Sequence, residues 1–215
     1  MPRKPETRSR LEAARERMYR DLVFESAEHK FAEQGFDDTT MQEIAAEAGI
    51  SLKTLYAHFP GKNELYAEIQ ETRGREFVAH VTKAHAAGDS ALDSLDRGVH
   101  AYVDFLVDHP DFLKIHLRER QAWGLQTEEE ALDGLGTFIT IIERGIEEGT
   151  FYPGNAQLLA RMGVALIQVP LADWTEGIGA ENAESVSEVI LVALHRLLCR
   201  PDAGEVDEAR RVAAR

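Results

Sequence analysis

Two short helical segments joined by a glycine turn constrain the fold of this chain more than any other feature. The segment TMQE at residues 40–43 has the form of a capping box and predicts the start of a helix over 40–48. Ser51 can cap a second helix over 51–59. Gly49 stands where the turn needs a left-handed backbone, which a Cβ would disfavour. Helices joined by so short a turn have to cross steeply, so the pattern predicts a helix-turn-helix.

Apolar residues at helical spacing supply a core for this motif. The wedge between the two helices consists of Ile44, Ala48, Ile50, Leu55 and Phe59. A preceding helix, expected to begin at Leu11 or Tyr19 and to end at Gln34, places Phe24, Ala27 and Phe31 on one face. A longer helix is expected to start near Lys62, to run towards His80, and to leave the compact unit there.

The rest of the chain also has the pattern of helices. The expected segments are 90–108, 111–123, one that Thr127 begins and Gly149 ends, 155–175 with a kink at Pro170, and one that Ser185 caps and Cys199 ends. No stretch alternates as a strand would, so the expected fold class is all-α: a three-helix helix-turn-helix domain followed by a helical bundle. The expected domains are 1–62 with a basic N-terminal arm, the bundle 63–200, and a tail, 201–215.

The acidic charge of the chain is unevenly distributed. The formal net charge is −14, which is unusual for a protein that neutralises phosphates. Residues 1–62 carry 10 Lys and Arg against 11 Asp and Glu, whereas the remaining residues carry 14 against 27. Within the first twenty positions there are 7 basic and 3 acidic residues. A nearly neutral N-terminal unit with a basic arm therefore precedes an acidic body; the arm either contacts DNA or is a solvated tail.

The N-terminal third resembles the tetracycline-repressor (TetR) family of bacterial regulators. The residues that carry the resemblance are Phe31-Ala32-Glu33-Gln34-Gly35-Phe36, Thr39-Thr40, Ile44-Ala45, Ala48-Gly49-Ile50-Ser51, Thr54-Leu55-Tyr56, His58-Phe59, Lys62 and Leu65. Lys30 and the pair Leu52-Lys53 depart from the family pattern. The resemblance implies a transcriptional regulator, expected to be a repressor, that binds a pseudo-palindromic double-stranded DNA operator as a homodimer and is released by a small-molecule effector.

The residues expected to bind DNA lie on and around the second helix of the motif. They are Thr40, Gln42, Ser51, Leu52, Lys53, Thr54, Tyr56, His58 and Lys62. Lys53 is expected to donate to guanine O6 and N7, and Leu52 to meet a thymine methyl group. Tyr56 and His58 resemble the phosphate clamps of the family. The alternatives are that Tyr56 packs between helices, that Thr40 and Ser51 only cap, and that Lys62 is a solvated charge.

The C-terminal body is expected to dimerise and to sense a ligand. Apolar stripes on its last two helices are too wide for one core, which predicts a four-helix interface about a two-fold axis. The expected interface residues are Leu158, Met162, Leu166, Val169, Val186, Val189, Ile190, Ala193, Leu194 and Leu197. The candidate ligand residues are His100, Tyr102, Phe105, His116, Trp123, Phe138, Arg161, Gln168 and Trp174. The alternative is that the body binds a protein partner, or that the chain acts as an activator.

Enzymatic chemistry has no support in the sequence. There is no phosphate-cradling glycine loop, no G-x-S-x-G segment and no H-E-x-x-H metal pair. No cofactor or metal is expected. The single cysteine, Cys199, suits a reducing compartment, and no apolar run approaches the length of a membrane span, so a cytoplasmic protein is expected.

Overall fold

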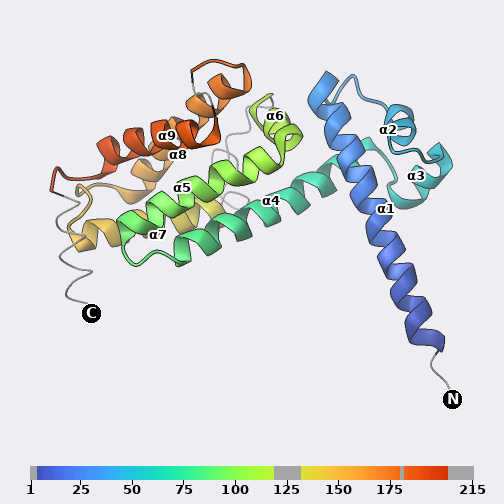
Figure 1. Cartoon of the computed structure of the whole chain (residues 1–215), viewed down its shortest axis with the longest axis horizontal. Coiled ribbons are helices and arrows are strands. Elements are labelled where there is room, and N and C mark those ends of the chain that lie inside the picture. Colours follow the sequence, from blue (N-terminus) through green and yellow to red (C-terminus); the bar gives the residue numbers. More distant parts are fainter. Residues whose placement is uncertain (1–3, 119–131, 180–181, 203–215) are drawn as a thin grey trace. The chain divides into compact units, whose positions relative to one another are not determined.

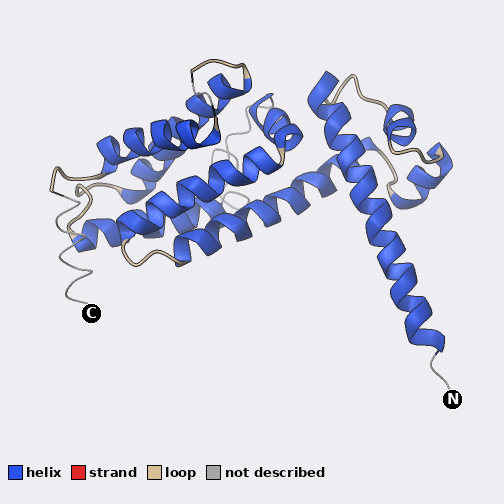
Figure 2. Ribbon diagram, in the orientation of Figure 1, coloured by secondary structure: helices blue, strands red, loops and turns tan. Residues whose placement is uncertain are grey.

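A computed structural model describes residues 4–118, 132–179 and 182–202. These residues form nine helices and no strand, as the fold-class prediction requires (Figures 1 and 2). The helices are α1 Lys4–Gln34, α2 Met41–Glu47, α3 Leu52–His58, α4 Lys62–Ala86, α5 Ala91–Asp108, α6 Pro110–Arg118, α7 Leu132–Glu148, α8 Ala156–Thr175 and α9 Ala183–Leu198. The all-α prediction is therefore confirmed.

The chain forms two compact units, which share α4. Unit 1 comprises Met1–Arg73 and unit 2 comprises Gly74–Arg215, so the division falls inside α4. α4 is one continuous helix that begins in the first unit and ends in the second. None of the described helices is long and apolar enough to cross a membrane.

The core of unit 1 is built from the helices expected to form the motif. Phe31, Ile44, Leu55 and Phe59 are almost fully buried, with exposed fractions of 0–1%. Burying side chains of this size contributes about 2 kcal/mol each to folding. Leu65 and Ile69 of α4 join this core, so the start of α4 folds as part of unit 1.

The core of unit 2 lies between α5, α7, α8 and α9, which pack against one another. Val103 and Leu106 of α5, Ile142 of α7, and Ile190 and Leu194 of α9 are buried there. An isolated antiparallel bridge between Phe151 and Cys199 ties the segment before α8 to the end of α9. The bundle is therefore closed by helix packing and by one backbone bridge.

Several helix boundaries differ from those expected. α1 begins at Lys4, well before Leu11. α9 is capped by Asn182, whose side-chain oxygen accepts from Ser185 N at 2.9 Å. Ser185 is therefore the third residue of the helix and not its cap. The expected helix start at Thr127 lies outside the described residues.

Candidate nucleic-acid interface

α2 begins with the expected capping box. Thr40 Oγ1 accepts from Glu43 N at 3.2 Å, and Glu43 Oε2 accepts from Thr40 N at 2.8 Å and from the Thr40 hydroxyl at 2.7 Å. The hydrogen bond from the Thr40 hydroxyl, with the one from its backbone, lowers the pKa of the Glu43 carboxyl. Thr40 is also solvent-exposed, so capping does not remove it from the surface.

The turn and the start of α3 also follow from local chemistry. Gly49 has φ 65°, the left-handed conformation that the turn was expected to need. Ser51 Oγ accepts from Thr54 N at 3.0 Å and lies 2.7 Å from Thr54 Oγ1, so both hydroxyls help to begin α3. The caps predicted at Thr40 and Ser51 are both confirmed.

α3 presents one face to its own core and another to solvent. Leu55 is fully buried, whereas Leu52 is 38% and Tyr56 50% exposed. Lys53 is exposed as well. Three side chains of different chemistry (apolar, cationic and phenolic) therefore occupy the outer face of this helix. Tyr56 is not packed between helices.

The remaining candidate residues around α3 divide into exposed and half-buried groups. Gln42 and Ser51 are exposed, and Thr54, His58 and Lys62 are half-buried. His58 Nδ1 lies 2.9 Å from Glu16 Oε1, and its ring stacks on Tyr19 at a centroid distance of 6.2 Å. These α1 partners of His58 were not foreseen, because the sequence gives no signal for a contact between positions so far apart.

Lys62 is held by unit 1 itself. Its ammonium donates to the carbonyl oxygens of Phe36 at 2.6 Å and Asp37 at 3.1 Å. It also lies 4.4 Å from the centroid of the Phe36 ring. The side chain therefore fixes the first turn of α4 against the segment that follows α1, and it is not merely a solvated charge.

The candidate ligand residues in unit 2 do not share one environment. Phe105 and Phe138 are buried, Tyr102, Gln168 and Trp174 are half-buried, and His100 and Arg161 are exposed. Phe105 and Tyr102 both pack edge-on against Phe77, and burial raises the pKa of Tyr102. Trp123 and the side chain of His116 lie outside the described residues.

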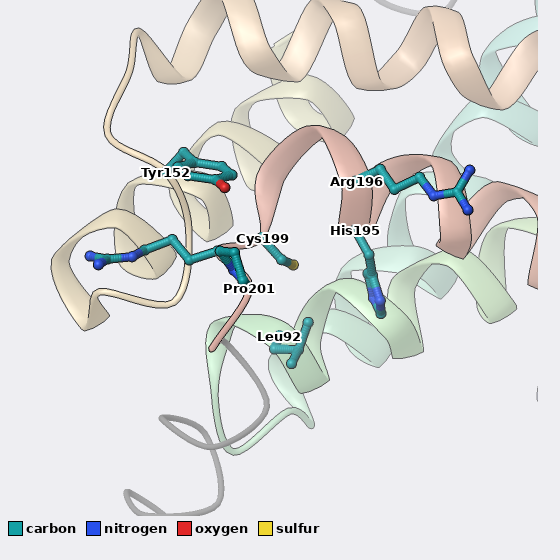
Figure 3. A pocket seen from close by; sticks show the side chains of 7 residues that line it. Leu92, Tyr152, His195, Arg196, Cys199 and Pro201 are labelled. Carbon is teal, nitrogen blue, oxygen red and sulfur yellow. The ribbon is translucent and has the colours of Figure 1, made fainter.

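A surface pocket of about 430 Å³ lies at the end of α9 (Figure 3). Its lining residues, none of which was a ligand candidate, are Leu92, Tyr152, His195, Arg196, Cys199, Arg200 and Pro201. The Arg196 side chain points away from Cys199 and Pro201 (Figure 3). His195 Nε2 lies 2.6 Å from Asp96 Oδ1, and burial raises the pKa of Cys199 to about 12. None of the residues that were ligand candidates lines this depression, so it does not coincide with the expected ligand site.

The candidate dimerisation residues divide into an exposed stripe and a buried set. Leu158, Met162, Leu166 and Val169 of α8, with Val189 and Val192 of α9, are 38–62% exposed. We call these six residues the α8–α9 stripe. Val186, Ile190 and Leu194 are fully buried in the core of their own chain, and Ala193 and Leu197 are half-buried. Val192 was not among the candidates, although it lies one turn beyond Val189.

Residues 23–69 match the family described as bacterial regulatory proteins, tetR family. The chain is 27% identical over 158 residues to the uncharacterized HTH-type transcriptional regulator YhgD of Bacillus subtilis (strain 168), covering 71% of this chain and 82% of that protein. It is 23% identical to the HTH-type transcriptional repressor SCO4008 of Streptomyces coelicolor, covering 71% of this chain and 75% of that protein. The solved structure of the ketosteroid transcriptional regulator KstR2 of Mycobacterium tuberculosis shares the fold. Its TM-score is 0.70 at 24% identity, with 84% of this chain and 95% of that chain covered. These proteins are transcriptional regulators and not enzymes.

Proposed function

This chain is a TetR-family transcriptional regulator with a helix-turn-helix DNA-binding domain, and from that premise we propose that it is a repressor. It binds a pseudo-palindromic operator as a homodimer and is released by a small-molecule effector. Residues 1–62 read DNA, with the basic N-terminal arm assisting, 63–200 dimerise and sense the effector, and 201–215 form a tail. The protein acts in the cytoplasm.

The outer face of α3 carries the DNA-reading part of this proposal. A recognition helix of this motif lies in the major groove with its first turn nearest the base edges. Lys53 and Leu52 are exposed in that first turn. Lys53 donates to guanine, Leu52 meets a thymine methyl group, and Tyr56 donates to a phosphate. Thr40, Gln42, Ser51 and Thr54 add contacts at the two helix starts.

The α8–α9 stripe supports the homodimer. Six large apolar side chains are exposed on α8 and α9, which pack against each other, and exposed apolar surface on this scale is typical of an interaction site. A second copy related by a two-fold axis would cover the stripe with the same stripe, making a four-helix interface. Such a dimer carries two recognition helices, which matches a pseudo-palindromic operator.

The repressor and effector parts rest on the relatives and on the size of unit 2. The Streptomyces coelicolor relative is named a repressor. A helix-turn-helix unit folds without a second unit of this length, so unit 2 has a further task. The candidate ligand residues that the structure describes do not share one environment. A protein that binds unit 2 is therefore the alternative to a small-molecule effector.

Base reading by Lys53 is tested on operator DNA selected from a random pool at stated salt. Lys53→Ala should relax the base preference at one position of each half-site, at a cost of ~1–3 kcal/mol against the preferred base. Tyr56→Phe should weaken binding to all sequences alike. Lys83→Ala, which removes an exposed lysine of unit 2, is the matched control and should change neither. An unchanged preference and affinity for Lys53→Ala would show that Lys53 does not read bases.

The effector alternatives are separated by Trp fluorescence and a gel shift. Both tryptophans, Trp123 and Trp174, fall in unit 2. A small apolar compound that quenches this fluorescence and abolishes the gel shift supports the small-molecule effector. Release of the DNA by a protein fraction, with no compound acting, would favour the partner protein.

A further inference from the structure

A partly buried ion pair joins α1 to α4 inside unit 1. Glu28 lies on the core face of α1 and is 6% exposed. Arg73 of α4 donates through Nε to Glu28 Oε1 at 2.7 Å and through Nη2 to Glu28 Oε2 at 2.9 Å. The two residues are 45 positions apart in the sequence. This two-point fork fixes both the distance and the orientation of the two side chains.

The pair belongs to a series of contacts along one face of α4. Lys62 is bonded to the carbonyls before α2, Tyr66 packs edge-on against Phe31 and Phe36, and Ile69 is buried. Arg73 comes one turn later and is the final residue of unit 1. A helix rises about 1.5 Å per residue, so these contacts span ~17 Å of α4. Of these contacts, Arg73 lies furthest along α4 and therefore has the largest effect on the direction of the helix.

A buried ion pair is weak evidence for stability, because apolar residues of similar volume often serve as well. Its better-attested use is to specify one arrangement among several. An apolar contact at this place would let α4 slide or tilt, whereas the fork holds a single geometry. The residues after Arg73 continue α4 to Ala86, ~20 Å further on.

We propose that the Glu28–Arg73 pair is a positioning contact that sets the direction in which α4 leaves the DNA-reading unit, and so sets the operator spacing that the dimer accepts. The inference rests on the proposed dimer and operator. A tilt of ~10° over a ~20 Å lever moves its end by ~3.5 Å, which is close to one base-pair step of DNA. Loosening the pair would thus let one dimer follow part of the change in half-site separation that one added or removed base pair makes, so its affinity would depend less on the spacing.

The test compares the full chain with three variants on selected operator DNA. Glu28→Met with Arg73→Met removes the pair without leaving a lone buried charge. Arg73→Lys keeps the charge but cannot form the fork. Arg97→Met removes an exposed ion pair with Asp93 in unit 2 and is the matched control. Each protein is titrated against a single half-site, the full operator, and operators with one base pair added to or removed from the spacer.

The double variant should bind the single half-site as the wild type does and bind the full operator ~10-fold more weakly, because the second contact loses effective concentration. Its affinities for the three spacings should differ less than those of the wild type. Arg73→Lys should lie between the two, and Arg97→Met should match the wild type.

A spacing profile identical to that of the wild type in both pair variants would overturn the proposal, and so would a half-site affinity that falls in parallel with the operator affinity. If the double variant fails to fold, as judged by its helical circular dichroism, Arg73→Lys decides alone. A wild-type chain that enriches no DNA would instead refute the proposed function itself, and this inference with it.

Discussion

Gly98→Ala should destabilise unit 2, because His85 occupies the space that the new methyl group needs. A Cβ at Gly98 would come within 3.0 Å of the Cε1, Nδ1 and Nε2 atoms of His85, closer than Cβ atoms approach other heavy atoms. The same ring donates from Nδ1 to the carbonyl oxygen of Ser94 at 2.7 Å. Adding the methyl group therefore forces the ring away from its hydrogen bond as well as from the helix.

The magnitude follows from three opposing terms. Overpacking a tight contact costs ~1–3 kcal/mol. Loss of the hydrogen bond to Ser94 costs about 1 kcal/mol, and the better helix propensity of alanine returns about 1 kcal/mol. The expected net loss is about 2 kcal/mol of unfolding free energy. Gly136→Ala in α7 is the matched control, since a Cβ there meets nothing within 4 Å. It should stabilise the unit by ~0.5–1 kcal/mol.

Urea unfolding followed by Trp fluorescence measures this effect in the correct unit, because both tryptophans fall in unit 2. In the double variant, His85→Ala should recover at least 1 kcal/mol of the Gly98→Ala loss, as contacting residues couple in a double-mutant cycle. A Gly98→Ala protein as stable as the wild type, or a coupling energy near zero, would refute the close packing of α4 on α5.

Three further predictions concern dimerisation, the start of α4 and pH. Met162→Glu in the α8–α9 stripe should raise the dimer dissociation constant by about 100-fold or more, since it buries an unpaired charge in the interface. Val107→Glu, at an exposed apolar residue outside the stripe, is the control. If light scattering shows that both variants dimerise equally, the stripe is not the dimer interface. Lys62→Met should cost about 1–2 kcal/mol of unfolding free energy, because two carbonyls lose a charged donor. Urea unfolding of the full chain followed by circular dichroism measures this loss, and unchanged stability would show that Lys62 has no structural role. Burial lowers the pKa of His85, so the unfolded chain takes up the proton first and stability should fall as the pH drops below about 6.5. His85→Asn should lose less stability over that range; an equal loss would show that His85 is not responsible.

The helix-turn-helix could be predicted from the sequence because its determinants are local. The Thr40 capping box, the Ser51 cap and the left-handed Gly49 each depend on residues within a few positions. Leu55 and Phe59 follow from helical periodicity. The outer face of α3 then follows by elimination, since Lys53 and Tyr56 lie opposite the buried positions.

Contacts between distant positions could not be predicted in the same way. Glu28 gives one signal, an acidic residue on the face that carries Phe24 and Phe31, but nothing in the sequence identifies Arg73 as its partner. The division of the candidate dimerisation residues into the exposed α8–α9 stripe and a buried set has the same cause. Val189 and Ile190 are neighbours in a helix that is apolar on several sides, and the packing of α9 on α5 and α8 decides which of them is buried.

Selection of bound DNA from a random pool, at stated salt and with the full chain, decides whether the protein binds a specific operator as a dimer. We predict enrichment of a pseudo-palindrome with two half-sites about one helical turn apart, or a multiple of it, bound by two chains. We also predict that affinity falls steeply with added salt. A pool that shows no enrichment over the starting library, or a single asymmetric site bound by one chain, would contradict the proposed function.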